Sequence, residues 1–219
     1  MWNSQVIIML LEGIRDTLYM TLASTLFGYI IGLPMGIVLT VTDKDGIRPN
    51  AAVYKVLDVI SNLLRSIPFI ILLIVLIPFT RFVVGRSYGS TATIVPLTIA
   101  AAPYIARMVE SSLKEVDAGV IEAARSMGAS DFQIVTRVML VEARTSLIVG
   151  ATISLGTILG YSAMAGTVGG VGLGDIAIRY GYTRWQTDIM VVTVVLLVIL
   201  FQIFQTIGMK IANRLDRRK

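Results

Sequence analysis

The stretch from residue 17 to residue 42, TLYMTLASTLFGYIIGLPMGIVLTVT, contains 26 consecutive residues without a charged side chain. Four further uncharged runs follow it along the chain. They cover residues 66–80, 87–106, 145–174 and 189–209, and contain 15, 20, 30 and 21 residues. About 20 apolar residues of α-helix cross the hydrocarbon core of a bilayer, so four of the five runs are long enough by themselves. The pattern predicts an all-α integral membrane protein.

The overall composition agrees with this interpretation and excludes several other classes of protein. Of the 219 residues, 55% are hydrophobic and 15% are charged, whereas soluble domains have about 25% charged residues. Cysteine and histidine are both absent, which excludes a disulfide framework, a thiol nucleophile and the usual zinc site. The net charge of +5 is assigned to cytoplasmic loops rich in Lys and Arg, and no nucleic-acid partner is expected.

Five transmembrane helices are predicted, at residues 17–41, 66–84, 90–109, 133–160 and 189–211. The second needs an argument, because its uncharged core has only 15 residues. Pro68 and Pro78 interrupt the helix there, which the interior of a bundle tolerates, so we expect a leading helix from about residue 53 and then a crossing segment, with Arg65 near the interface. Residues 1–11 lack the basic region of a secretory signal. We expect them to lie in the interface and lead into the first span.

The basic residues predict the orientation of these spans, because cytoplasmic segments are enriched in Lys and Arg. With the amino terminus outside, 14 basic residues lie inside and five lie outside, and the opposite topology reverses this ratio. The inside set is Lys44, Arg48, Lys55, Arg65, Arg107, Lys114, Arg125, Arg137, Arg144, Lys210, Arg214, Arg217, Arg218 and Lys219. The outside set is Arg15, Arg81, Arg86, Arg179 and Arg184. The carboxyl terminus and the loop at residues 115–132 are therefore predicted to be cytoplasmic.

The number of spans is odd and we find no internal repeat, although transporters formed by one chain usually contain one. Any solute pathway is therefore expected between two copies of this chain, or between it and a similar chain. Glycines recur at intervals of four residues, at Gly28, Gly32 and Gly36 in the first predicted span. Small residues at this spacing let membrane helices approach closely. The spacing is compatible with packing inside one subunit and with a subunit interface.

The loop between the third and fourth predicted spans reads EVDAGVIEAARSMGASDFQIVTR, and it is too charged to cross the bilayer. Asp117 is predicted to cap a short helix over residues 118–127. Gly128 suits the left-handed position that ends such a helix. Ser130 and Gln133 form a capping-box pattern that starts the next helix.

The short helix in this loop is predicted to dock on another surface, because about ten residues of helix are only marginally stable in water. Its predicted apolar face consists of Val120, Ala123, Ala124 and Met127. Two docking sites are compatible with the sequence. One is the membrane surface or the underside of the chain's own bundle. The other is a groove on a cytosolic partner, with Glu122 and Arg125 fixing the orientation.

The same loop resembles the EAA signature of ABC-importer permeases. Glu122, Ala123 and Ala124 are followed after three residues by Gly128, and nine residues further on by the aliphatic Val138 and Leu140. The wider chain resembles the methionine-importer permeases of this family in RSIPFIILL (residues 65–73), IVPLT (94–98), APYIARMVE (102–110) and GYSAM (160–164). The resemblance extends from the first span to the fifth. It implies a type I ABC importer permease fold, with residues 1–219 as a single transmembrane permease domain in the bacterial cytoplasmic membrane.

The resemblance also implies roles and partners. The loop would be the coupling helix, held in a cleft of the ATP-hydrolysing subunit, with five residues transmitting the ATPase motion: Glu122, Ala123, Ala124, Arg125 and Gly128. The partners would be a second copy of the chain, a cytoplasmic ABC ATPase dimer, an extracytoplasmic methionine-binding lipoprotein and membrane lipid. The family usually has prolines after the aliphatic pair, where this chain has Val141 and Thr145. We therefore expect a more continuous helix leaving the loop.

The chain contains no G-x-x-x-x-G-K-[ST] motif, so it is not expected to hold ATP in the P-loop manner. No cofactor is expected in this chain, and ATP and Mg are assigned to the partner ATPase. An ion-coupled secondary transporter is the main alternative, but it would normally place ionisable residues within its spans, and the uncharged runs contain none. A non-transporting membrane scaffold is a further alternative.

The segment GYSAMAGTVGGVGLG, residues 160–174, is the predicted pathway segment, because backbone rich in Gly and Ala can leave the helix where it lines a cavity. Met164 from two subunits is predicted to close the pathway near the outer side, with Tyr161 and Ser162 lining it. Ordinary core packing of Met164 is the alternative.

A cluster of aromatic residues precedes the last span. Tyr180, Tyr182 and Trp185 stand beside Arg179 and Arg184. They are interpreted as an aromatic belt at the membrane interface. Contact with the extracytoplasmic binding protein is the alternative that the family resemblance implies.

Overall fold

The structure is a computed structural model that describes residues 4–215, and every regular element in this range is helical. The elements are α1 (Ser4–Thr42), α2 (Ala51–Ser66), α3 (Phe69–Val75), α4 (Ile77–Val84), α5 (Ser90–Lys114), α6 (Ala118–Ser126), α7 (Asp131–Gln133), a π-helical segment (Ile134–Met139), α8 (Leu140–Glu142), α9 (Arg144–Ala165), a 3-10 turn (Gly166–Val168), α10 (Leu173–Ile176), a second π-helical segment (Ala177–Tyr182) and α11 (Thr187–Leu215). The predicted all-α fold is confirmed. Arg217, Arg218 and Lys219, and the first three residues of the predicted interfacial segment, lie outside the described range.

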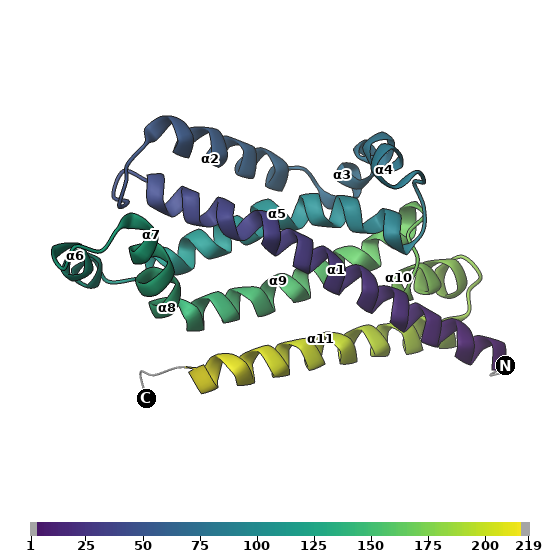
Figure 1. The fold of residues 1–219 in the computed structure, drawn as a ribbon. Helices are drawn as coiled ribbons and strands as arrows, with labels where there is room; N and C mark the ends of the chain where they lie inside the picture. Colours follow the sequence, from purple (N-terminus) through teal and green to yellow (C-terminus); the bar gives the residue numbers. More distant parts are fainter. Residues whose placement is uncertain (1–3, 216–219) are drawn as a thin grey trace.

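Four helices are long and apolar enough to cross a bilayer, namely α1, α5, α9 with its 3-10 extension, and α11. They run along the long axis of an elongated bundle (Figure 1). They contain the cores of the first, third, fourth and fifth predicted spans. The fourth differs in detail from the prediction, because its long helix begins at Arg144 rather than at residue 133.

The second predicted span, residues 66–84, is not one helix. It consists of α3 and α4, which have seven and eight residues. Taken together, α2 and α3 are instead long and apolar enough to cross a bilayer, but the two helices are bent by 102° at their junction. The bend lies at Pro68, whose ring fixes φ and whose nitrogen carries no hydrogen to continue α2. The described chain therefore has four spans, or five when the bent pair counts as one.

The amino-terminal segment is part of the first long helix. α1 has 39 residues, which at 1.5 Å per residue is about 58 Å, roughly twice the thickness of the hydrocarbon core. Residues 4–11 continue this helix without a break, so they are not a separate surface helix.

The glycines of α1 mediate its contact with α5. Gly28, Gly32 and Gly36 are all buried and all face α5. A Cβ added to Gly32 would lie 2.6 Å from the Ala102 carbonyl oxygen, and one added to Gly36 would lie 2.5 Å from the Ala106 carbonyl oxygen. Van der Waals contact between small residues is a main source of association between helices in lipid. Of the two readings of the glycine pattern, packing within one subunit is therefore confirmed.

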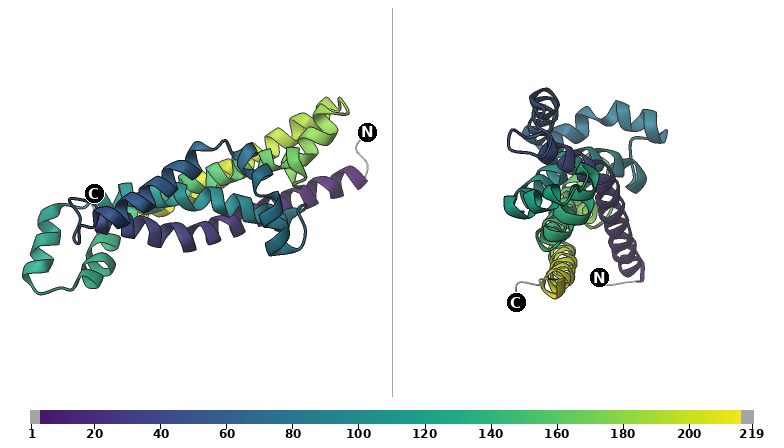
Figure 2. Two further views of the ribbon diagram at one scale, coloured as in Figure 1. Left: turned by 90° about the horizontal axis from the view of Figure 1, so that it is seen from above. Right: turned by 60° about the vertical axis from the view of Figure 1, so that its left-hand side comes forward.

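The bundle has two distinct ends. The carboxyl end of α11, the start of α2 and the whole of α6 lie at one end, whereas the start of α1, α4 and α10 lie at the other (Figure 1). Figure 2 shows α6 projecting beyond the long helices at its end of the molecule. The predicted topology assigns this end to the cytoplasm.

Candidate functional site

The α6 hairpin forms through local hydrogen bonds that match the sequence prediction. The Asp117 carboxylate accepts a hydrogen bond from the Gly119 backbone N–H at 2.7 Å, so it caps α6. Gly128 has a φ of +82°, the left-handed conformation that ends the helix. Ser130 and Gln133 form both bonds of a capping box, at 2.9 and 3.4 Å. The predicted short helix, glycine turn and second helix start are confirmed.

The packing face of α6 differs from the predicted one. Of the predicted set, only Ala124 is buried, and half-buried Ile121 packs beside it against the main core. Val120 and Met127 are 42% and 82% exposed. Because Ile121 and Ala124 are three residues apart, they share one side of the helix, and this side faces the bundle. The apolar residues on the adjacent side, about 100° around the helix axis, are left uncovered.

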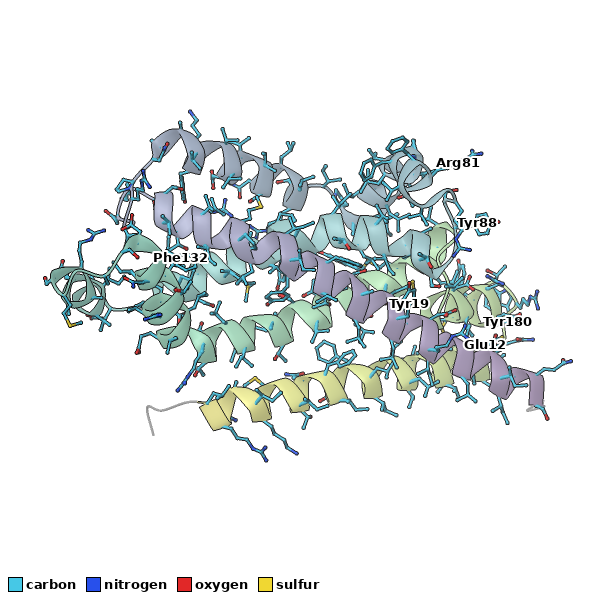
Figure 3. The ribbon with its side chains drawn as sticks, in the orientation of Figure 1. Glu12, Tyr19, Arg81, Tyr88, Phe132 and Tyr180 are labelled. Carbon is cyan, nitrogen blue, oxygen red and sulfur yellow. The ribbon has the colours of Figure 1, made fainter. Side chains whose placement is uncertain are left out.

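We call the uncovered set the α6 ridge, and it consists of Val120, Ala123 and Met127, all exposed. Phe132 on α7 is also 77% exposed and lies at the same end of the molecule (Figure 3). Glu122 is exposed beside the ridge. A contiguous apolar surface on a helix that projects from the bundle is suited to insertion into a groove of another molecule.

Arg125 contacts this chain's own backbone. Its guanidinium Nη2 donates a hydrogen bond to the carbonyl oxygen of Ile47, at 2.7 Å. Ile47 lies in the loop between α1 and α2, 78 residues away in sequence. Arg125 was predicted to fix the orientation of the helix on a partner, whereas in this structure its guanidinium is bonded inside the subunit. Together with the burial of Ala124, this contact attaches α6 to both the loop after α1 and the core.

A cluster of ion pairs lies behind α6, at the same end of the bundle. Its centre is Glu110 of α5, which is only 4% exposed. Glu110 accepts hydrogen bonds from Arg107 at 2.7 Å, from Lys114 at 2.8 Å and from the Tyr54 hydroxyl at 3.3 Å. Arg107 also pairs with Asp58 of α2. The cluster therefore ties α2 to α5.

The cluster extends to the end of α1 through Lys114, which pairs with Asp43 at 2.7 Å. This hydrogen bond from Lys114 lowers the pKa of the Asp43 carboxyl below its usual value. Sequence reasoning missed the cluster. Its signal was the spacing of Arg107, Glu110 and Lys114, which at three and four residues apart lie along one face of a helix.

The chain leaves the α6 loop through an irregular helix. Residues Ile134–Met139 form a π-helical segment, and Ala143 is a one-residue turn between α8 and α9. The expectation of a more continuous helix, based on the missing prolines, was wrong. The π-helical segment buries Ile134, Val135 and Met139 together, and such a widened turn is commonly found at functional sites.

The predicted gate residues lie near the end of α9 that is remote from α6. Tyr161 stacks on Phe69 of α3, with ring centroids 4.6 Å apart and planes at 4°. Met164 is 46% exposed. Ser162 differs from the prediction, because it is 1% exposed and donates its hydroxyl hydrogen to the Leu159 carbonyl at 2.7 Å. In this structure Ser162 is a packed helix residue and does not line an open pathway.

The aromatic cluster before α11 lies at the amino-terminal end, where Figure 3 labels Tyr180 and Glu12. The Arg184 guanidinium lies over the Tyr180 ring, 4.6 Å from its centroid. Trp185 is 85% exposed and has a φ of +56°, which is unusual for a bulky residue. A cavity of about 760 Å³ separates this cluster from the start of α1. The belt and the docking interpretations both remain compatible with this arrangement.

Comparison with known proteins defines the class of this chain. The family of binding-protein-dependent transport system inner membrane components matches residues 19–219, and the chain belongs to this family. It is a multi-pass inner-membrane permease subunit of an ABC transporter, and the ATPase is a separate subunit. This membership excludes the ion-coupled carrier and the scaffold.

Within that family the chain falls among the methionine-transport permeases. It is 47% identical to the probable D-methionine transport system permease protein of Vibrio cholerae over 210 residues, which cover 96% of this chain and 93% of the relative. It is 54% identical to the D-methionine transport system permease protein of Escherichia coli K12 over 158 residues, 72% of this chain and 73% of the relative.

Solved structures give the same result. An inward-facing conformation of the MetNI methionine ABC transporter superposes with a TM-score of 0.97 at 49% identity, over 99% of this chain and 100% of the other. An amino acid ABC transporter solved with histidines matches at a TM-score of 0.79 and 19% identity, over 96% and 95%. The second likeness concerns the fold alone.

Proposed function

We propose that this chain is the membrane subunit of a methionine importer in which two copies form an alternating-access pathway. A cytoplasmic ATPase dimer would bind ATP and Mg, and an extracytoplasmic lipoprotein would deliver the amino acid. The substrate is supported by the names of the relatives, which are D-methionine permeases. The need for a second copy is supported by the small number of spans, four or five in the described chain.

The observation that carries the proposal is the α6 ridge on a helix anchored to several elements. Arg125 links α6 to the loop after α1, and Ala124 links it to the core. Because the ion-pair cluster joins that loop to α2 and α5, a force on α6 would act on several long helices at once. A partner ATPase that holds the ridge in a groove could therefore reorient the bundle. In this arrangement Glu122, Ala123 and Gly128 serve docking and not catalysis.

Reversal of the charge at Glu122 tests this assignment. Glu122→Arg is expected to lower ATP-driven methionine uptake at least tenfold, either by uncoupling hydrolysis from uptake or by releasing the ATPase. The assay is uptake and ATP hydrolysis in proteoliposomes, with co-purification of the ATPase as the binding readout. Glu142→Arg, the same reversal at an exposed carboxylate of α8, is the control and should retain uptake. Unchanged uptake and ATPase binding in Glu122→Arg would refute the assignment.

We further propose that Met164 closes the pathway against Met164 of the second copy, near the outer side. Its 46% exposure in the single chain supports a contact that the second copy would complete. Met164→Ala should increase uncoupled ATP hydrolysis or leak of methionine from loaded proteoliposomes. Met209→Ala, at a comparably exposed methionine of α11, is the control. Normal leak and normal hydrolysis in Met164→Ala would rule out this gate.

A further inference from the structure

A cavity of about 230 Å³ lies at the bend between α2 and α3. Its floor is formed by α5 and α9, which contribute Ala100, Tyr104 and Tyr161. Its rim is formed by the bend itself, which contributes Leu64, Arg65, Ile67, Phe69 and Leu72. Discontinuous membrane helices commonly form substrate sites, because the break exposes backbone groups inside the bundle.

The lining of this cavity combines apolar and polar side chains. Phe69 and Tyr161 form a stacked aromatic pair, with Leu72 beside them. Arg65 is the basic residue of the lining, and within the described residues no carboxylate lies at ion-pair distance from it. α2 ends one residue later, at Ser66, and the last carbonyls of a helix lack partners within it and carry partial negative charge.

We propose that this cavity is a subsite for a free amino acid with an unbranched apolar side chain, of the methionine class. The inference rests on the proposed import function and adds a substrate site within this chain. The carboxylate of the ligand pairs with Arg65, and its ammonium group faces the carbonyl end of α2. The side chain packs on Phe69 and Tyr161, where a thioether makes favourable contacts with aromatic rings. An unpaired guanidinium is the complement that such a carboxylate requires.

The position along the bundle is consistent with a site on the pathway. Tyr161 precedes Met164 by three residues, or about 4.5 Å along a helix. α9 runs from the α6 end of the molecule toward the α10 end (Figure 1). The cavity therefore lies on the α6 side of Met164, which is the cytoplasmic side of the gate in the proposed topology.

Equilibrium binding of radiolabelled methionine to the purified permease–ATPase complex, in nanodiscs and without the binding protein, tests the subsite. Arg65→Gln is expected to weaken binding about 10- to 100-fold, because it removes a charged hydrogen-bond donor. Methioninol, which lacks the carboxylate, should bind equally to wild type and Arg65→Gln. Lys55→Gln, at another exposed basic residue of α2 that lies outside the cavity, is the matched control and should bind like wild type.

Several results would overturn the subsite. These are equal methionine affinity in wild type and Arg65→Gln, no binding by wild type, or an effect of Arg65→Gln on methioninol as large as on methionine. An effect of Arg65→Gln confined to nanodiscs with anionic lipid would assign the arginine to a lipid phosphate and also overturn it. ATP-driven uptake by the complex with its binding protein distinguishes a failure of the subsite from a failure of the proposed import function. Normal uptake with an unchanged KM in Arg65→Gln refutes the subsite alone, and no uptake by wild type refutes the import function.

Discussion

Replacement of Gly32 by alanine is expected to destabilise the chain, because this glycine lets α1 touch the backbone of α5. The added Cβ would lie 2.6 Å from the Ala102 carbonyl oxygen and 2.9 Å from the Ile105 Cβ. Neither atom is the end of a flexible side chain, so relief requires α1 and α5 to separate. Overpacking of this kind costs about 1–3 kcal/mol, and the better helix propensity of alanine offsets up to about 1 kcal/mol.

The net effect of Gly32→Ala is therefore a loss of up to about 2 kcal/mol in the free energy of unfolding. For a chain of this length that corresponds to a fall of up to about 8 °C in Tm. Thermal unfolding of the purified chain in a mild detergent measures it. Gly150→Ala in α9 is the matched control, because its added Cβ would make only ordinary van der Waals contacts with Met108, at 3.4 Å from Cε and 3.6 Å from Cβ. If Gly32→Ala and Gly150→Ala have the same Tm, the close contact between α1 and α5 is refuted.

Two further predictions concern the ion-pair cluster. Glu110→Gln should lower the free energy of unfolding by about 2–4 kcal/mol, because Arg107 and Lys114 lose the buried negative charge that they share and one of its two accepting oxygens becomes a donor. Thermal unfolding measures this, and a Tm equal to wild type would show that the cluster does not stabilise the fold. Asp43 has a lowered pKa in the folded state, so its contribution to stability is present above the unfolded pKa of about 3.9 and is lost as the pH falls through the folded value. Asp43→Asn should therefore show a weaker decrease of Tm between about pH 5 and pH 3 than wild type, and identical pH profiles would contradict this reasoning.

The features that could be predicted from the sequence depend on neighbours along the chain. The uncharged runs predicted the long helices, because the length needed to cross a bilayer is a property of a continuous segment. Asp117, Gly128 and the Ser130–Gln133 box were recognisable because a cap forms within three residues of the helix end. The EAA pattern was also recognisable, because all its residues lie within one short stretch of the sequence.

The features that could not be predicted depend on residues far apart in sequence. The ion-pair cluster joins Asp58 to Arg107, which are 49 residues apart, and no local pattern specifies that pairing. The leading helix and its interruption at Pro68 were predictable from the sequence, but the angle of 102° between α2 and α3 was not. The cavity at this bend has no sequence signature of its own.

The α6 helix shows which features follow from the sequence and which depend on tertiary packing. Its existence, its ends and its amphipathic character follow from the sequence alone, since hydrogen bonds within one turn decide them. The side that faces the bundle was decided by tertiary structure. Ile121 and Ala124 are buried because the core and the Ile47 carbonyl lie on that side, and Val120 and Met127 are thereby left exposed. Periodicity groups residues on a helix, but only the packed neighbours determine which group is covered.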